Sequence, residues 1–152
     1  MKFEIQTLKA KDIPSVSKLI DHAFSESVAS TLTDEGIHNF KIGTTPESIK
    51  KRFLSGNTFI VCKHKNNVVG VGEIRNNNHL NLFFVEPSLQ RKGIGKKLFN
   101  HLLMAVIENE ITVNASLNAV NAYTKLGFII SSSANIIREI KYQPMVYKIN
   151  KQ

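Results

Sequence analysis

The centre of the chain carries the motif Gln90-Arg91-Lys92-Gly93-Ile94-Gly95, which follows a strand-like run at 81–85 and opens a helical pattern at Gly93. The N-terminus of a helix offers unpaired N–H groups and a partial positive charge, so it binds anions. Gly93 and Gly95 have no Cβ, and a phosphate can therefore approach the backbone closely. Four cations crowd this end of the helix although they oppose its dipole: Arg91, Lys92, Lys96 and Lys97. The motif predicts an anion-binding turn, and the alternative is a solvated basic loop.

Two common phosphate-binding patterns do not fit this motif. A Walker A loop requires the pattern G-x-x-x-x-G-K-S/T, and Gly95-Lys96-Lys97 lacks both the hydroxyl and the earlier glycine. The dinucleotide-binding pattern requires a third glycine at the position of Leu98. Electrostatics alone therefore leaves the identity of the anion open.

The motif and its surroundings resemble the acetyl-coenzyme A loop of the GNAT superfamily of N-acetyltransferases. That loop has the pattern Q/R-x-x-G-x-G/A and follows a strand that ends in V-x-P, here Val85-Glu86-Pro87. Further along the chain, the helix expected at 117–126 ends in Tyr123-Thr124-Lys125-Leu126-Gly127-Phe128, which is similar to a second signature of the family. Two further segments, 79–85 and Tyr142-Gln143-Pro144-Met145, are similar to a bacterial branch with a Y-x-P-M ending. The resemblance covers most of residues 56–149.

Hydrophobic periodicity divides the chain into helices and strands. Strands are expected at 3–8, 58–63, 68–74, 80–85, 111–114, 127–130 and 145–149, and helices at 12–24, 45–54, 93–108 and 117–126. The polar segment 25–43 is expected to be a loop or a short helix. Helices and strands mixed along one chain favour an α+β (mixed α/β), sheet-based domain. The resemblance implies the GNAT fold, a mostly antiparallel mixed sheet of six to seven strands flanked by about four helices, in a single domain over residues 1–152.

Length and composition fit one globular domain. The chain has 152 residues, of which 42% are hydrophobic, and its formal net charge is +8. Such a charge implies an anionic partner, either a phosphorylated small molecule or nucleic acid, or simply a basic surface. The single cysteine, Cys62, excludes an internal disulfide framework. No signal peptide or membrane-spanning run is found, so we expect a soluble, cytoplasmic protein without a membrane partner.

The resemblance assigns acetyl-coenzyme A as co-substrate and gives a role to backbone groups of the strand at 80–85. In the family, the end of this strand lends N–H groups to the acetyl and pantetheine carbonyls, here from Phe83, Phe84 and Val85. The N–H of Val85 is expected to polarise the thioester carbonyl. The pyrophosphate is expected to bind to Gln90, Arg91, Lys92, Gly93, Ile94, Gly95 and Lys96. Asn114 and Ser116 are expected to bind the pantetheine arm, and Ser116 is an equally good helix N-cap.

Tyr123 is the expected general acid, because the family places a tyrosine beside the cofactor sulfur. A thiol has a pKa of about 8.5 and a tyrosine one of about 10, so proton donation to the leaving thiolate is uphill by roughly 2 kcal/mol. That cost lies within an enzymatic barrier. The alternative is a tyrosine that packs on the sheet with its hydroxyl in water.

The attacking amine must lose a proton, since a lysine-like amine has a pKa of about 10.4 and is charged at pH 7. Glu73 and His79 are the two candidate general bases, near the end of one strand and the start of the next. Histidine has the better unperturbed pKa for this task. Each residue is alternatively a polar strand-edge side chain that faces solvent. The other histidines show no ligand pattern, so no metal is expected.

The acceptor is defined only as a class. The resemblance implies a primary amine on a small molecule or a peptide, bound by the segments 25–43 and 131–143, in a monomer or homodimer. Two other functions are considered: a GNAT-fold protein that binds acyl-coenzyme A without transfer, and a basic nucleic-acid-binding module. The second is disfavoured because the aromatic residues lie in apolar runs rather than among basic side chains.

Overall fold

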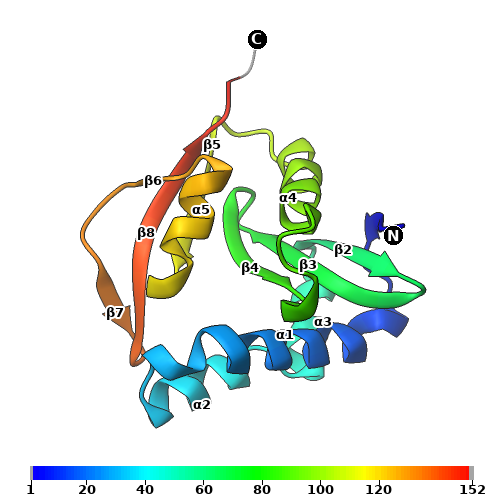
Figure 1. The fold of residues 1–152 in the computed structure, drawn as a ribbon, viewed down its shortest axis with the longest axis horizontal. Coiled ribbons are helices and arrows are strands. Elements are labelled where there is room, and N and C mark those ends of the chain that lie inside the picture. The colour runs from blue at the N-terminus through cyan, green and yellow to red at the C-terminus, as the bar shows by residue number, and fades with distance from the viewer. Residues whose placement is uncertain (1, 151–152) are drawn as a thin grey trace.

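The computed structural model describes residues 2–150, which form one eight-stranded mixed sheet and five α-helices (Figure 1). The strands are β1 (Glu4–Thr7), β2 (Thr58–His64), β3 (Asn67–Arg75), β4 (His79–Val85), β5 (Glu110–Ala115), β6 (Ile129–Ile130), β7 (Asn135–Ile137) and β8 (Ile140–Lys148). The α-helices are α1 (Ile13–Ser27), α2 (Asp34–Ile42), α3 (Pro46–Leu54), α4 (Ile94–Met104) and α5 (Val120–Leu126). Short 3₁₀ helices are η1 (Ala10–Asp12), η2 (Ala29–Thr31), η3 (Pro87–Leu89) and η4 (Leu117–Ala119). Within residues 2–150, no helix is long and apolar enough to cross a membrane.

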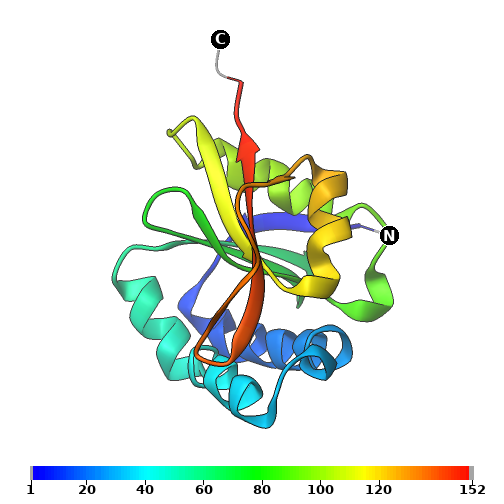
Figure 2. The ribbon, with the colours of Figure 1, turned by 90° about the vertical axis from the view of Figure 1, so that its left-hand side faces the viewer.

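The strands pair in the order β1-β2-β3-β4-β5-β8-β6, and β7 pairs with β8 beside this path. The pairs are antiparallel apart from β4 with β5, which are parallel and connected through α4. Figure 2 shows β8 lying beside β5 and the β7–β8 hairpin reaching toward α2. The one parallel pair therefore lies in the middle of the sheet, between two antiparallel halves.

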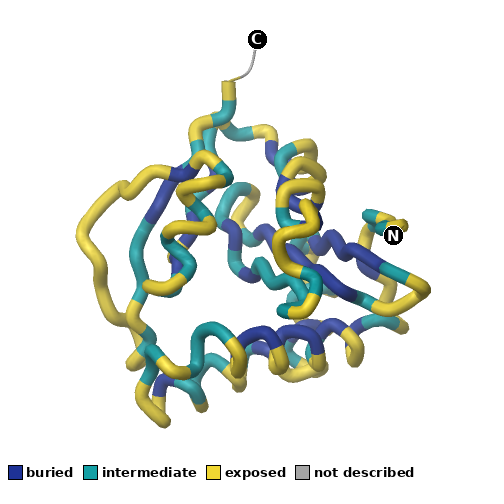
Figure 3. Tube along the Cα trace, in the orientation of Figure 1, coloured by how far each residue is buried: buried dark blue, intermediate teal, exposed yellow. Residues whose placement is uncertain are grey.

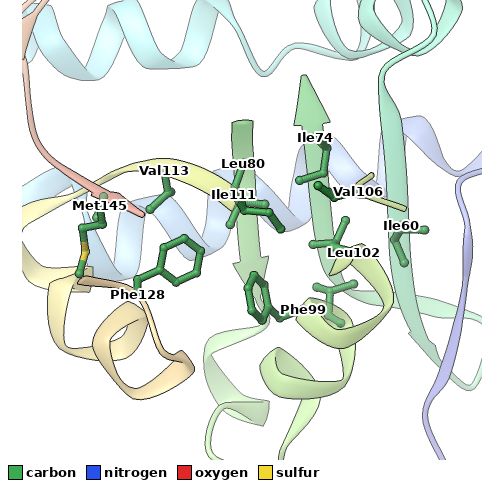
Figure 4. Packing of buried hydrophobic residues seen from close by; sticks show 12 residues of the cluster. Ile60, Ile74, Leu80, Phe99, Leu102, Val106, Ile111, Val113, Phe128 and Met145 are labelled. Atoms are coloured by element: carbon green, nitrogen blue, oxygen red, sulfur yellow. The ribbon is translucent and has the colours of Figure 1, made fainter. Parts of the chain in front are cut away.

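Helices cover both faces of the sheet. On α1 the apolar residues Ile13, Val16 and Ile20 recur at helical spacing, and all are buried against β3 and β4 together with Ile49 of α3. Figure 3 shows this buried stripe along the side of α1 that faces the strands. The opposite face carries a second core in which α4 and α5 pack on the strands, part of which is drawn in Figure 4.

The helix α4 lies directly on the backbone of β3. A Cβ added to Gly72 would lie 2.5 Å from Cδ1 of Leu102, a distance that real Cβ atoms do not adopt. Glycine in this strand therefore permits the close approach of the helix. The approach also brings the start of α4 to the end of β4, where an ideal Cβ on Gly95 would lie 3.9 Å from the ring of Phe83.

A β-bulge lies in β4 where this strand leaves β5. Glu73 of β3 pairs with Leu82 and the next residue pairs with Leu80, so Asn81 has no partner across the strand. The parallel pairing with β5 ends at the same place, with Leu80 opposite Val113. An extra residue bends a strand and increases its twist. The bulge therefore accounts for the divergence of β4 from β5 toward their C-terminal ends.

The structure confirms the mixed α+β sheet and adds elements that the periodicity did not resolve. The polar segment 25–43 contains α2, whose first turn is capped by the Thr33 hydroxyl, which accepts from the Gly36 N–H at 3.1 Å. The expected helix at 117–126 starts as η4, and the helix at 93–108 already ends at Met104 so that Val106 can enter the core. The sheet has eight strands rather than six or seven, because β7 and the first half of β8 form an additional hairpin.

Candidate active site

The divergence of β4 from β5 leaves backbone N–H groups of β4 without a neighbouring strand. The N–H of Glu86 donates to the Val69 carbonyl at 2.8 Å, toward β3. Because N–H groups alternate along a strand, those of Val85 and Phe83 point the other way, toward the side that β5 has left. The N–H of Phe84 points toward β3. Of the three expected backbone donors, two therefore face the gap between the strands.

The turn after β4 presents further free N–H groups. η3 follows the strand, and the side chain of Gln90 folds back to donate to the Val85 carbonyl at 3.4 Å. Arg91 and Gly93 both have left-handed backbones, with φ of 66° and 82°. The first helical bond of α4 is donated by Lys97 to the Gly93 carbonyl at 3.1 Å, so the N–H groups at 94–96 have no helical acceptor. Such a turn concentrates backbone donors on one side.

Glycine is favoured at positions 93 and 95 of the turn for different reasons. Gly93 has positive φ, a conformation that costs a non-glycine residue roughly 1 kcal/mol. Gly95 lies in the helix, and a Cβ there would make only ordinary contacts of 3.9–4.0 Å with Phe83 and Val85. Nothing in the protein therefore requires glycine at 95, and its lack of a side chain leaves space above the helix start. The residues present fit a pyrophosphate.

The side chains of the turn divide into two kinds. Ile94 is buried in the core with Cys62 and Val69, so it can contribute only its N–H group to a ligand. The cationic side chains are exposed: Arg91, Lys92, Lys96 and Lys97. Together they give the turn a positive surface that matches an anion.

Tyr123 lies next to the end of this free edge of β4. Its ring lies 6.1 Å from that of Phe83 and 5.3 Å from that of Phe128, measured between ring centroids. Burial raises the pKa of the Tyr123 hydroxyl well above its usual range, so the phenol stays protonated at physiological pH. No group between residues 2 and 150 hydrogen-bonds to this hydroxyl. It is therefore a free proton or hydrogen-bond donor.

Asn114 and Ser116 lie at the C-terminal end of β5, across the gap from β4. Asn114 is exposed and pairs with Pro144 of β8. Ser116 occupies the N-cap position of η4, but its hydroxyl makes no capping hydrogen bond. Both side chains therefore keep their polar atoms free of contacts within the described chain.

His79 lies at the closed end of the gap, on the opposite face from Tyr123. Its Nδ1 lies 2.8 Å from the Thr112 hydroxyl. Burial first, and the nearby Arg75 guanidinium second, lower the pKa of His79 from 6.5 to about 4. The imidazole is consequently neutral at pH 7, and it is a weaker base than a free histidine.

Glu73 is fully buried and surrounded by donors. Its Oε2 accepts from Arg52 Nε and from Asn57 Nδ2, each at 2.8 Å, and its Oε1 accepts from Asn81 Nδ2 at 2.9 Å. The Asn81 Oδ1 in turn accepts from Arg75 Nε at 3.0 Å. This network, defined as Arg52, Glu73, Asn81 and Arg75, joins the bulge of β4 to α3.

Glu73 and His79 were expected from the sequence, but the residues that bind the Glu73 carboxylate were not. Arg52 and Asn57 come from α3 and the loop after it, and no local pattern indicates that they meet Glu73. Asn81 did give a signal, because it is a polar residue within the apolar run at 79–85.

The two segments expected to bind the acceptor lie together. Asn39 of α2 donates to the Arg138 carbonyl in the β7–β8 turn at 2.9 Å. A cavity of about 250 Å³ lies between the α1–α2 connection and this hairpin, and it is lined by Ser30, Thr31, Leu32, Thr33, Ile136, Glu139 and Lys141. On the other side, Asn118 of η4 hydrogen-bonds to the Ser27 carbonyl at the end of α1. Within residues 2–150 there is no group of three or more His, Cys, Asp or Glu side chains placed to hold a metal ion.

The site combines an anion-binding turn with a strand that diverges from its parallel neighbour. The profile of the family described as "Acetyltransferase (GNAT) domain" matches residues 28–149. The chain belongs to this GNAT acetyltransferase family, whose members are acyltransferases that use acetyl-coenzyme A. No curated protein matches the chain by sequence.

Solved structures show the same fold. A GCN5-related N-acetyltransferase from Rhodopseudomonas palustris is 16% identical, with a TM-score of 0.82 over 98% of this chain and 97% of that one. The PaiA N-acetyltransferase from Thermoplasma acidophilum, solved in complex with coenzyme A, is 18% identical, with a TM-score of 0.83 over 97% and 99%. The ribosomal-protein-S18-alanine N-acetyltransferase from Escherichia coli is 14% identical, with a TM-score of 0.69 over 99% and 96%. At these identities the likeness establishes the fold alone.

Proposed function

We propose that this chain transfers an acetyl group from acetyl-coenzyme A to a primary amine, with both substrates bound at the same time. The observation that carries the proposal is the contact between Tyr123 and Phe83 beside the free N–H edge of β4. The Tyr123 hydroxyl can then donate a proton close to N–H groups of β4 that can bind a carbonyl. A protein that only binds acyl-coenzyme A needs the edge but has no use for the tyrosine hydroxyl.

The pyrophosphate of the co-substrate binds to the turn at 90–96. Free N–H groups of Ile94, Gly95 and Lys96 donate to it, and the exposed cations around them compensate its charge. Gly95 allows the phosphate to approach the backbone closely. Acetyl-coenzyme A supplies the activated thioester, and the other end of its pantetheine arm extends along β4 toward the bulge, with Asn114 and Ser116 across the gap.

The thioester carbonyl is assigned to an N–H group of β4. Val85 and Phe83 both offer one toward the gap, about 6.6 Å apart at about 3.3 Å per residue. Tyr123 contacts the Phe83 ring, so the carbonyl next to the leaving sulfur lies nearer to Phe83 than the sequence argument placed it. We therefore assign the thioester carbonyl to the Phe83 N–H and a pantetheine carbonyl to the Val85 N–H. Donors fixed before the reaction stabilise the charge that develops on the oxygen.

Tyr123 donates the proton to the leaving sulfur. Burial that raises the pKa of the phenol also disfavours a bare thiolate in the same apolar surroundings, so the difference between the two pKa values stays small. The reference difference of about 1.5 units corresponds to roughly 2 kcal/mol. That value is compatible with general acid catalysis.

The amine loses its proton on the other face of β4. His79 is neutral at pH 7 and can accept a proton, but with a pKa of about 4 it cannot hold one for long against water. We assign it the role of a relay that passes the proton, through water, toward solvent beside Thr112. Glu73 has three donors on its two oxygens, and we assign it to holding the bulge rather than to proton transfer.

Two measurements on the purified chain test this function. Acetyl-coenzyme A at about 100 times its dissociation constant is expected to add about 2.7 kcal/mol of unfolding free energy, seen as a rise in Tm. A panel of primary amines with acetyl-coenzyme A is expected to release thiol with at least one acceptor. No thermal stabilisation at millimolar co-substrate refutes the binding site. Stabilisation without thiol release from any amine refutes the transferase and favours a binding protein.

A further inference from the structure

Arg75 is the last residue of β3 and is held beside the β4 bulge. Its Nε donates to the Asn81 Oδ1 at 3.0 Å, and within residues 2–150 its guanidinium has no other hydrogen bond and no ion pair. The two Nη groups are therefore free. The side chain is half-buried, so the guanidinium is only partly surrounded by water.

The orientation of this guanidinium is set by the network behind it. The Asn81 amide cannot turn over, because its Nδ2 donates to Glu73 at 2.9 Å while its Oδ1 accepts from Arg75. Glu73 is in turn fixed by Arg52, which also donates through Nη1 to the Gly43 carbonyl at 2.8 Å. A side chain positioned by such a supporting layer binds a ligand with little loss of freedom. The Arg75 guanidinium is therefore preorganised to bind a ligand through its two Nη groups.

Arg75 differs from its charged neighbours on this side of the sheet in having no ion-pair partner among residues 2–150. Glu73 is paired with Arg52, and Glu110, on the same face of β5, is paired with Lys148 at 2.7 Å. His79, the neighbour of Arg75 across the strands, is neutral at pH 7 because burial and Arg75 itself disfavour its charged form. Arg75 itself forms no ion pair with an acidic side chain within residues 2–150. An acceptor with only ammonium groups would meet repulsion here.

From this arrangement we infer that Arg75 binds an anionic group, a carboxylate, on the acceptor amine. The acceptor is then an amino-acid-like molecule rather than a polyamine or another purely cationic amine. A guanidinium with two free Nη groups matches the two oxygens of a carboxylate in planar geometry. The inference rests on the proposed transferase function and specifies its second substrate.

The position of Arg75 relative to the acetyl group fits this substrate. Asn81, which holds Arg75, is the bulged residue and lies two positions before Phe83 in β4. The thioester carbonyl is assigned to the Phe83 N–H. An acceptor that spans this short distance carries its carboxylate close to the reacting amine, as α-amino and β-amino acids do. In the strand register Arg75 lies opposite His79, and His79 lies opposite Thr112 of β5.

The test compares each of the protein amino acids with its own α-carboxamide as acceptor, with thiol release measured at saturating acetyl-coenzyme A. The amide removes the carboxylate and also lowers the pKa of the amine, so it supplies more free amine at pH 7 and would react faster without recognition. The variants are Arg75→Gln and Arg75→Lys. Lys18→Gln, which removes an exposed charge from α1, is the matched control.

We expect at least one amino acid to exceed its amide tenfold or more in kcat/KM. Arg75→Gln is expected to lower that value about 10- to 100-fold through KM, with unchanged Kd for acetyl-coenzyme A and unchanged rates on amides. Arg75→Lys is expected to recover part of the loss, and Lys18→Gln to behave as the original chain.

Three results would overturn the inference while the transferase function stands. Amides could react as well as the amino acids, or Arg75→Gln could lower kcat/KM equally for amino acids and amides. The third result is a higher kcat/KM with spermidine than with any amino acid. Absence of thiol release from every amine would refute the transferase function and this inference together. Stabilisation by acetyl-coenzyme A, measured alongside, then tells whether the co-substrate site itself exists.

Discussion

Replacing Glu73 with alanine tests the structural part of the site most directly. The carboxylate is 0% exposed and forms three hydrogen bonds, and its partner Arg52 has a side chain that is 24% exposed. Its removal leaves a largely buried guanidinium and two amide donors without their acceptor. Removing one partner of a buried ion pair costs about 3–5 kcal/mol. We expect the unfolding free energy to fall by that amount.

Urea denaturation and thermal melts measure the effect. For a domain of this size each kcal/mol shifts Tm by about 2–4 °C, so the expected decrease is roughly 6–20 °C. Glu110→Ala is the control, because its bond to Lys148 is equally short at 2.7 Å, but the side chains are 37% and 65% exposed. An exposed pair of this kind contributes at most about 1 kcal/mol. The contrast therefore depends on burial and not on bond length.

A loss below about 1 kcal/mol in Glu73→Ala, or equal losses in the two variants, would refute the reasoning. A companion variant, Glu73→Gln, separates positioning from proton transfer. If Glu73 orients the bulge, Glu73→Gln changes turnover and stability together, whereas a general base would lose turnover with little change in Tm. A double variant that makes both Glu73 and Arg52 apolar is expected to recover part of the stability.

Three further predictions concern the site. Gly95→Ala is expected to raise the unfolding free energy by about 0.5–1 kcal/mol, since alanine favours helix, yet to weaken acetyl-coenzyme A binding about tenfold or more, measured by calorimetry. Tyr123→Phe is expected to lower kcat about 100-fold with unchanged acetyl-coenzyme A affinity, and unchanged turnover would move the acid role elsewhere. Because the pKa of His79 falls from 6.5 unfolded to about 4 folded, the unfolded chain binds more protons between these values. The associated stability is present above pH 6.5 and is lost as pH falls through 4. Partial exposure reduces this stability from about 3 to about 1–2 kcal/mol. In His79→Gln the unfolding free energy measured by urea denaturation should depend less on pH across this range.

The sequence was informative wherever a local backbone requirement selects a residue type. Gly93 stands at a helix start that has positive φ, and the helix expected at 45–54 begins as expected, with Thr45 accepting from the Ser48 N–H. The turn at 90–95 and the strand before it could therefore be placed without the structure. The start of α1 is less regular, because the Asp12 carboxylate forms an ion pair with Lys63 at 2.8 Å and makes no capping hydrogen bond.

Long-range contacts could not be predicted. Glu73 meets Arg52 across 21 residues, and only the packing of α3 beside β3 brings them together. The bulge at Asn81 depends on the pairing of β3 with β4, which a single strand does not encode. The β7–β8 hairpin was missed because Arg138 and Glu139 adopt positive φ without a glycine, so the usual turn signal is absent.

The N–H groups of Phe83 and Val85 form an unpaired strand edge inside the molecule rather than at its border. An open edge on the outside of a sheet invites pairing with another chain and leads to aggregation. Here the edge lies inside the sheet, between β4 and β5, with Gly95 of α4 and Tyr123 of α5 next to Phe83. A thin, flexible ligand with its own amide groups can enter and take the place of the missing strand. On this view the co-substrate completes the sheet, and amide hydrogen exchange at Phe83 and Val85 should slow when it binds.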